Sequence, residues 1–265
     1  MRILAAVLLL PVLLAAQAPM PLAVGETFTL ASQALGETRT INVYAPPGHP
    51  LRGGPPLPVL VMPDGGLAED FLHVAGLVQV GAGNGTMRPM LLVGIENTAR
   101  RRDLTGPTTV AGDSAIAPVV GGSAAFRRFL RDELLPVIAE RYGVTDQRAI
   151  VGESLAGLFV LETLFVEPDL FDTFIAIDPS LWWNDGALVR AASSRGAMTG
   201  TQGETVVIAH SDQAEIAAAS AALAASLRGS RHVTTHLLPF PRETHATIYH
   251  PAALAAFRLV LAPLP

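Results

Sequence analysis

Residues 148–165 read RAIVGESLAGLFVLETLF, with a single serine between two apolar segments. Residues 149–151 form a short apolar run that predicts a buried strand, and residues 158–165 continue as an apolar helix. Ser154 lies between them in a turn of small residues. A sharp strand-to-helix turn exposes the serine hydroxyl, and the positive N-terminal end of the next helix favours negative charge there. The stretch therefore predicts a nucleophilic serine, with a serine that merely caps an ordinary helix as the alternative.

The motif around this serine is close to G-x-S-x-G, the nucleophile elbow of α/β-hydrolases. Ala156 takes the last position of the motif, and Gly157 follows it. Alanine is small enough for such a turn, so the interpretation as an elbow stands.

Strand and helix patterns alternate along the chain from residue 58 onward. Continuous apolar runs predict buried strands at residues 58–62, 90–95, 149–151, 173–177, 205–209 and 233–240. Helical spacing is found at residues 67–80, 123–142, 158–165, 187–194, 214–227 and 251–261. Two half-buried strands, residues 27–30 and 38–44, precede this region. We expect an α/β fold of the α/β-hydrolase type, with a mostly parallel sheet covered on both faces and antiparallel strands at its N-terminal edge.

Composition excludes several classes of function. The chain has 265 residues, 50% hydrophobic and 15% charged, and a formal net charge of -5, which gives no reason to expect nucleic acid as a partner. It contains no cysteine, so disulfides, thiolate catalysis and cysteine-ligated metals are excluded. We expect neither a metal nor an organic cofactor.

The N-terminus has the pattern of a secretory signal peptide. Met1 and Arg2 precede an apolar run over residues 3–14, and residues 16–18 read AQA, a cleavage-site pattern. We expect a signal peptide at residues 1–18, a single domain at residues 19–265, and export to the periplasm or the medium. The apolar run is short for a membrane span of about 20 residues, which makes an uncleaved anchor the weaker alternative.

A nucleophilic serine needs a histidine base, which on this fold comes late in the chain. His245 lies in the loop between the last predicted strand and the final helix, where that base belongs. His250, just before Pro251, is the alternative and has the position of a helix-capping surface residue.

The acid that orients the base is expected after a strand and between serine and histidine in chain order. Asp212, the first carboxylate after the strand at 205–209, is our choice. Glu215 lies about one helical turn later and has the pattern of a first-turn carboxylate. Asp178, at the end of the preceding strand, is the third candidate.

An oxyanion hole requires two N–H groups that converge on one oxygen. The N–H of Leu155, directly after the serine, is the first. Gly66, in the turn DGG at residues 64–66, is expected to supply the second, since glycine lets the backbone approach a substrate closely. A plain glycine-rich turn before a helix is the alternative.

Three further residues are candidates for substrate binding. Arg100 and Arg102 lie in the run RRRD at residues 100–103, within a long loop at residues 100–122 of the kind that forms lids and binding segments. A structural pair of arginine with aspartate that pins the loop is the alternative. Trp182, in the segment WW, is expected at the same edge of the sheet and could line a pocket, or it could be a packing residue.

These motifs together resemble the esterase family that includes esterase D, siderophore trilactone hydrolases, feruloyl esterases and mycolyltransferases. Residues 97–105, NTARRRDLT, resemble the N-T-x-R-x-R-D-L-T segment of the branch that hydrolyses siderophores. Residues 126–136 are similar to the helix before its elbow, and residues 177–183, IDPSLWW, to its P-S-L-W-W loop. Ser154 falls on the family nucleophile and residues 243–245 on the segment with the family base.

The resemblance implies a serine carboxylic-ester hydrolase that acts on a small-molecule ester through an acyl-enzyme. Siderophore lactones and phenolic or short acyl esters are the candidate substrates. An acyltransferase of the mycolyltransferase type, a peptidase and a non-catalytic binding protein on the same fold are the alternatives. We expect no stable membrane insertion after signal cleavage, and we make no prediction of the oligomeric state.

Overall fold

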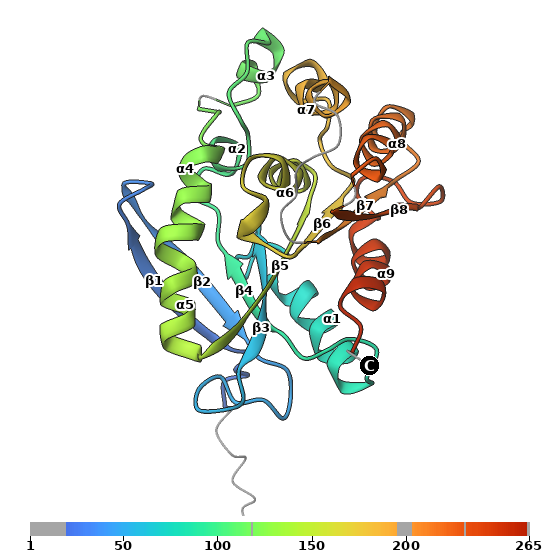
Figure 1. Cartoon of the computed structure of the whole chain (residues 1–265). Helices are drawn as coiled ribbons and strands as arrows, with labels where there is room; N and C mark the ends of the chain where they lie inside the picture. Colours follow the sequence, from blue (N-terminus) through green and yellow to red (C-terminus); the bar gives the residue numbers. More distant parts are fainter. Residues whose placement is uncertain (1–19, 118, 195–202, 231, 264–265) are drawn as a thin grey trace, which may run out of the picture.

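The computed structural model describes residues 20–117, 119–194, 203–230 and 232–263 (Figure 1). The predicted signal peptide, residues 1–18, lies outside the described residues. The strands are β1 (Glu26–Ser32), β2 (Glu37–Tyr44), β3 (Leu57–Pro63), β4 (Leu91–Ile95), β5 (Val144–Glu153), β6 (Thr173–Ile177), β7 (Glu204–His210) and β8 (Val233–Pro239). They form one eight-stranded sheet in the order β1-β2-β4-β3-β5-β6-β7-β8.

The sheet is mostly parallel, as the sequence predicts. β1 pairs with β2 and β2 with β4 in antiparallel fashion, whereas every pair from β4 to β8 is parallel. The expected α/β fold, with antiparallel strands at the N-terminal edge, is confirmed.

Helices cover both faces of the sheet (Figure 1). The α-helices are α1 (Phe71–Gly83), α2 (Arg100–Asp103), α3 (Ala111–Ala115), α4 (Ser123–Arg128), α5 (Leu135–Tyr142), α6 (Leu155–Val166), α7 (Trp183–Ser194), α8 (Ala214–Arg228) and α9 (Tyr249–Val260). A 3₁₀ turn, η2 (Pro168–Leu170), follows α6. α1 and α9 pack together on one face, whereas α5, α6 and α8 contact the other.

Strand residues divide alternately between two apolar cores, as the two-residue period of a strand requires. Val59, Val61 and Ile150 belong to the core under α6, and Leu60 and Met62 belong to the core under α1 and α9. All five are buried, so β3 and β5 are covered on both sides. This explains why their sequences read as continuous apolar runs.

The helix expected at residues 123–142 contains a π-helical segment. α4 runs through η1 (Phe129–Leu134) into α5. Pro136 has no N–H to donate to the preceding turn, so the regular hydrogen-bond ladder is interrupted near this point.

The region predicted as a long loop, residues 100–122, contains the short helices α2 and α3. Asp103, at the end of α2, accepts a hydrogen bond of 2.5 Å from the fully buried guanidinium of Arg39 on β2. The ion pair ties the start of this region to the sheet. α2, α3 and α7 lie together at the top of the molecule in Figure 1.

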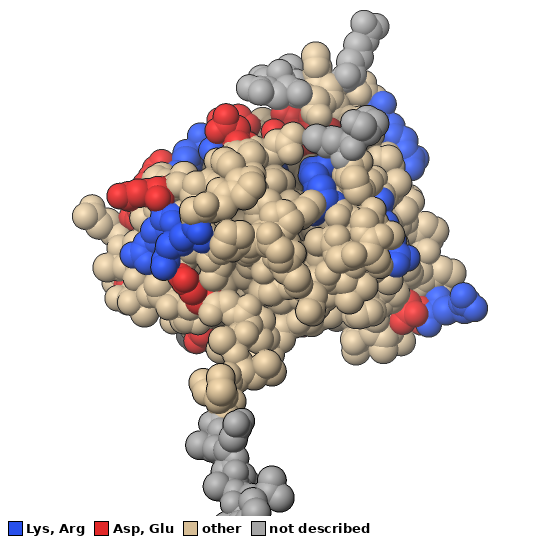
Figure 2. Space-filling view, turned by 90° about the horizontal axis from the view of Figure 1, so that it is seen from below, with Lys and Arg blue, Asp and Glu red and all other residues tan. Residues whose placement is uncertain are grey.

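Within the described ranges, no helix is long and apolar enough to cross a membrane. Figure 2 shows the molecule from below, opposite to α3 and α7. Charged side chains of both signs are scattered around the edge of that face, and uncharged residues cover its middle. This face therefore offers no continuous basic surface for nucleic acid.

Candidate active site

Ser154 occupies a strained turn between β5 and α6. Its backbone has φ 60° and ψ −120°, a conformation that is uncommon for a residue with a Cβ atom. Its N–H donates to the carbonyl oxygen of Ile177 on β6 at 3.0 Å, which fixes the turn against the sheet. The Ser154 side chain makes no capping hydrogen bond to α6. The geometry is that of a nucleophile elbow and not of an ordinary helix cap.

Small residues are necessary at this turn because its backbone segments touch. A Cβ atom on Gly152 would lie 2.6 Å from the carbonyl carbon of Ala156, and one on Gly157 would lie 3.1 Å from the carbonyl oxygen of Ile177. Ala156 is fully buried. The alanine at the last motif position therefore fits, whereas the two glycines have little room for a side chain.

His245 lies within hydrogen-bond distance of the serine, as predicted. Its Nε2 atom is 3.1 Å from Ser154 Oγ, and its Nδ1 atom is 2.6 Å from Oδ2 of Asp178. Asp178 directly follows β6 and is fully buried. The three side chains form a continuous line from carboxylate to imidazole to hydroxyl.

The choice of Asp212 as the acid was wrong. Its side chain is exposed, and its backbone N–H donates to the carbonyl oxygen of Glu243 at 2.9 Å, so it ties together the two loops after β7 and β8. The carboxylate that reaches His245 is the third candidate, Asp178. Ser211 holds it, through its N–H at 2.7 Å and its hydroxyl at 3.0 Å. Glu215 is exposed at the start of α8.

The surroundings of Asp178 favour the ionised form of its carboxyl group. Burial raises the pKa of Asp178, but the hydrogen bonds from His245 and Ser211 outweigh it, and the net pKa is lowered. The hydrogen bond to Asp178 raises the pKa of His245, against the effect of burial, and the negative charge of Glu153 adds to this rise. The Asp178 carboxylate is therefore placed to stabilise a positive charge on the imidazole of His245.

The predicted oxyanion donors differ in availability. Leu155 begins α6, and the N–H groups of a first helical turn have no partner within the helix. The N–H of Gly66, by contrast, donates to Glu69 Oε2 at 2.7 Å, and the N–H of Glu69 donates back to the Gly66 carbonyl oxygen at 3.0 Å. Glu69 thus covers the second predicted donor in this structure.

Both arginines proposed for substrate binding are held by carboxylates. Arg100 makes a two-pronged pair with Asp64, with Nε–Oδ1 at 2.7 Å and Nη2–Oδ2 at 2.8 Å. Arg102 bonds to Glu37 at 2.7 Å and to Asp103 at 2.7 Å. Both arginines therefore form structural ion pairs with carboxylates, which is the alternative to substrate binding given in the sequence analysis.

Of the two tryptophans, Trp182 is 46% exposed and Trp183 is buried, with its Nε1–H donated to the carbonyl oxygen of Gly106 at 3.0 Å. Trp182 lines a cavity of about 320 Å³ between α7 and α8, together with Ile216 and Ala219. It is the tryptophan that a ligand could reach.

Sequence reasoning missed Ser180. Its hydroxyl lies 3.3 Å from Ser154 Oγ, and its N–H donates to the Ser154 carbonyl oxygen at 3.0 Å. The signal was present in the P-S-L-W-W motif, which carries Ser180 two residues after Asp178. Glu153, which directly precedes the nucleophile, was also missed.

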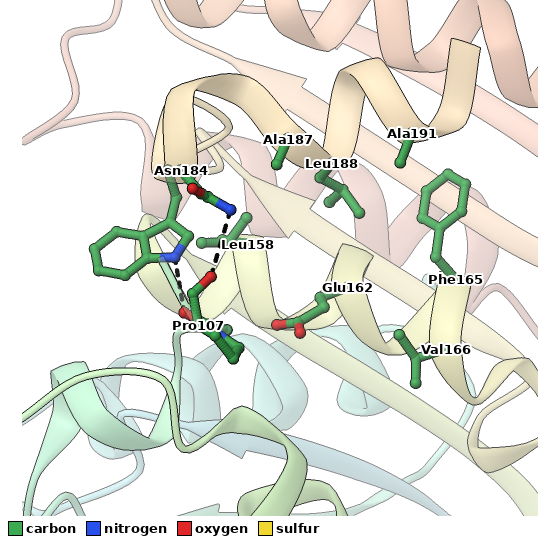
Figure 3. A pocket seen from close by; sticks show the side chains of 11 residues that line it. Pro107, Leu158, Glu162, Phe165, Val166, Asn184, Ala187, Leu188 and Ala191 are labelled. Atoms are coloured by element: carbon green, nitrogen blue, oxygen red, sulfur yellow. Dashed lines mark hydrogen bonds between the residues drawn. The ribbon is translucent and has the colours of Figure 1, made fainter. Parts of the chain in front are cut away.

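A second cavity, of about 230 Å³, lies between α6 and α7 (Figure 3). Leu158, Phe165 and Leu188 line it, together with the carboxylate of Glu162. Ser154 and His245 are not among its lining residues, so it is separate from the serine site.

Across the described part of the chain, no group of three or more His, Cys, Asp or Glu side chains is arranged to hold a metal ion.

Comparison with known proteins finds esterases among the similar sequences. A family model described as "Putative esterase" matches residues 32–235. Ferri-bacillibactin esterase BesA of Bacillus subtilis is 40% identical over 113 residues, which are 40% of this chain and 37% of the relative. Siderophore triacetylfusarinine C esterase of Aspergillus fumigatus is 32% identical over 66% of this chain and 62% of the relative.

The solved structure of an IroE-like serine hydrolase from Shewanella oneidensis superposes with a TM-score of 0.78 at 25% identity, covering 89% of this chain and 80% of the neighbour. The sequence matches span 37% of the length of the Bacillus subtilis esterase and 62% of the length of the Aspergillus fumigatus esterase. The family model covers well over half of this chain, and so the chain belongs to the putative esterase family.

Proposed function

We propose that this chain is a serine carboxylic-ester hydrolase whose catalytic residues are Ser154, His245 and Asp178. The observation that carries the proposal is the hydrogen-bonded line from Asp178 through His245 to the strained Ser154, with distances of 2.6 and 3.1 Å. Family membership and relatives named as siderophore esterases support the same chemistry.

In the proposed mechanism, Ser154 Oγ attacks the ester carbonyl carbon while His245 Nε2 accepts the hydroxyl proton. The tetrahedral intermediate collapses, and His245 gives that proton to the leaving alkoxide. Water then attacks the acyl-enzyme while His245 accepts one of its protons; on collapse of the second tetrahedral intermediate His245 returns that proton to Ser154 Oγ, and the carboxylic acid departs. Asp178 stays ionised throughout and stabilises the imidazolium.

The developing oxyanion would accept hydrogen bonds from the N–H of Leu155 and of Gly66. For Gly66 this requires the Glu69 carboxylate to move away from the N–H, since the two acceptors compete for one donor. The neighbouring hydroxyl of Ser180 would orient Ser154 Oγ by donating to it while Ser154 donates to His245.

We propose a siderophore ester or lactone as the substrate, because the relatives above are named for such esters. Trp182, the exposed tryptophan of the P-S-L-W-W loop, is the residue we expect to contact it. We further propose that residues 1–18 are a cleaved signal and that residues 19–265 work as one exported unit. N-terminal sequencing of the protein from a periplasmic fraction would test the cleavage.

The experiment for the function is a hydrolysis panel. The purified protein and Ser154→Ala are incubated with siderophore trilactones, feruloyl esters and p-nitrophenyl esters, and products are followed by mass spectrometry with and without added alcohols. Hydrolysis that depends on Ser154 is expected. Transfer of the acyl group to an alcohol would favour the acyltransferase, and no turnover at all would favour a binding protein.

A further inference from the structure

We infer that the serine site ranks esters by charge, cationic before neutral before anionic, and that Glu153 is a specificity-determining residue for this ranking. The inference rests on the proposed esterase function and names the class of substrate that the same site prefers.

Carboxylates gather at the carboxyl ends of three neighbouring parallel strands. β3, β5 and β6 lie side by side in the sheet, and Asp64, Glu153 and Asp178 stand at their ends. Because parallel strands end at the same edge, these side chains surround the elbow that β5 carries. Glu69 and Asp70 add two more carboxylates from the turn between β3 and α1.

Their charges act on the reacting groups. Burial, with contributions from Asp70 and Asp178, raises the pKa of Glu153 to about 7, while His245 and Arg100 oppose the rise. Glu153 in turn contributes to the raised pKa of His245, after the larger effect of the hydrogen bond that His245 donates to Asp178. An ester bound at Ser154 lies within the same negative field.

Two of the three arginines Arg100, Arg102 and Arg242 are already paired with carboxylates. Arg100 is the arginine whose charge acts on both Glu153 and His245, and its guanidinium is bonded on two atoms to Asp64. Arg102 is bonded to Glu37 and Asp103. The third, Arg242, three residues before His245, is exposed on its loop and makes no salt bridge to a described carboxylate. The carboxylates therefore outnumber the cations at this end of the sheet.

Glu153 is the carboxylate best placed to meet a substrate. It directly precedes the nucleophile and is half-buried, so one side of it reaches the surface. Asp64 is committed to Arg100, Asp178 to His245, and Glu69 to Gly66. Within the described residues, the carboxylates of Glu153 and Asp70 make no hydrogen bond or salt bridge, and of these two Glu153 adjoins the nucleophile. A cationic group next to the scissile ester would supply the partner that this carboxylate lacks.

The size of the effect follows from Coulomb's law. A unit charge within about 8 Å of a substrate charge, partly screened by water and salt, changes binding by roughly threefold to thirtyfold. The attraction of a cation and the repulsion of an anion both enter the ratio of their kcat/KM values. We therefore expect a cation-to-anion ratio of at least about tenfold at low ionic strength.

The test uses three butyrate esters of similar shape, namely butyrylcholine (cationic), 3,3-dimethylbutyl butyrate (neutral) and 2-sulfoethyl butyrate (anionic). Release of butyric acid by the full protein is followed in a pH-stat at pH 8, in 20 mM and in 500 mM NaCl. The inference expects the ranking above and a cation-to-anion ratio that shrinks in high salt. Equal rates, or a faster anionic ester, would overturn it.

Two matched variants assign the effect to Glu153. Glu153→Gln is expected to lower the cation-to-anion ratio at least threefold. Glu140→Gln, an exposed carboxylate on α5 near the opposite end of β5, should leave the ratio unchanged. Equal ratios in the two variants would remove Glu153 from the role. If Glu153→Gln does not fold, the same ratio is measured for Asp70→Asn and for the unmodified protein at both salt concentrations. A ratio that falls neither in Asp70→Asn nor in high salt would contradict the charge ranking.

The two proposals fail in different ways. If the folded protein hydrolyses none of the three esters and none of the siderophore, feruloyl and p-nitrophenyl esters, the proposed function is contradicted and the ranking with it. If it hydrolyses the neutral ester but does not distinguish the charged ones, only the charge ranking is contradicted.

Discussion

The imidazole Nδ1 of His245 lies 2.6 Å from Oδ2 of Asp178, a residue 67 positions earlier in the chain. The carboxylate is fully buried at the end of β6, next to the strand that carries the nucleophile. Asp212, closer to the histidine in the sequence, touches the histidine loop only through its backbone. The acid of the proposed triad is therefore defined by the order of strands in the sheet.

Asp178→Asn should lower kcat/KM for a p-nitrophenyl ester by about 10²- to 10⁴-fold, because an amide neither stabilises the imidazolium nor fixes its tautomer. Asp212→Asn should change the same quantity less than twofold, since its side chain is exposed. Steady-state kinetics on both variants, with circular dichroism as the control for folding, compares them. The reverse order of effects would restore Asp212 as the acid.

The pH dependence of kcat/KM should reflect the raised pKa of His245. Only the neutral imidazole can accept the serine proton, so activity rises as pH passes upward through that pKa. Because Asp178 raises the pKa of His245, the midpoint of this acid limb should lie above the ordinary histidine value of about 6.5. In Asp178→Asn the midpoint of the residual activity should move to lower pH. An unchanged midpoint would show that the limb belongs to another group.

The buried pair of Arg39 and Asp103 should matter for stability. Asp103→Asn would remove the charge that lies 2.5 Å from the fully buried guanidinium of Arg39 and leave the partly exposed Glu37, at 3.1 Å, as its ionic partner. Because breaking a buried pair costs about 3–5 kcal/mol, we expect a loss of stability that approaches this range. Asp185→Asn, which breaks an exposed pair with Arg190, should cost less than about 1 kcal/mol. Urea unfolding of both variants measures the difference. Similar free energies of unfolding would contradict this view of Arg39.

Gly152→Ala should disrupt the elbow. The new methyl group would meet the backbone carbon of Ala156 at 2.6 Å, and backbone cannot move away as a flexible side chain can. We expect loss of most esterase activity together with a lower melting temperature. Gly76→Ala, inside α1, where a Cβ atom meets nothing within 4 Å, is the control; it should leave the activity unchanged and should not lower the melting temperature, since alanine favours a helix interior. A fully active Gly152→Ala would mean that the turn can relax.

Local patterns were sufficient to predict the sheet and the pairing of Ser154 with His245. Apolar runs mark strands buried on both faces, and the elbow motif and chain order lead to the serine and the histidine that lie within hydrogen-bond distance of each other. The carboxylate that contacts His245 was not predicted, because Asp178 and Asp212 both follow strands, and only the tertiary position of Ser211 shows which carboxylate is held. The same limit applies to Arg100 and Gly66, whose partners Asp64 and Glu69 become visible only when the chain is folded.

The most direct measurement of the central claim is mass spectrometry of the protein after reaction with a fluorophosphonate, which labels serines activated by a neighbouring base. The account predicts one adduct, located on Ser154, that is absent in Ser154→Ala and forms at least 10²-fold more slowly in His245→Ala. No adduct in the folded protein, or an adduct on another serine that persists in Ser154→Ala, would contradict it.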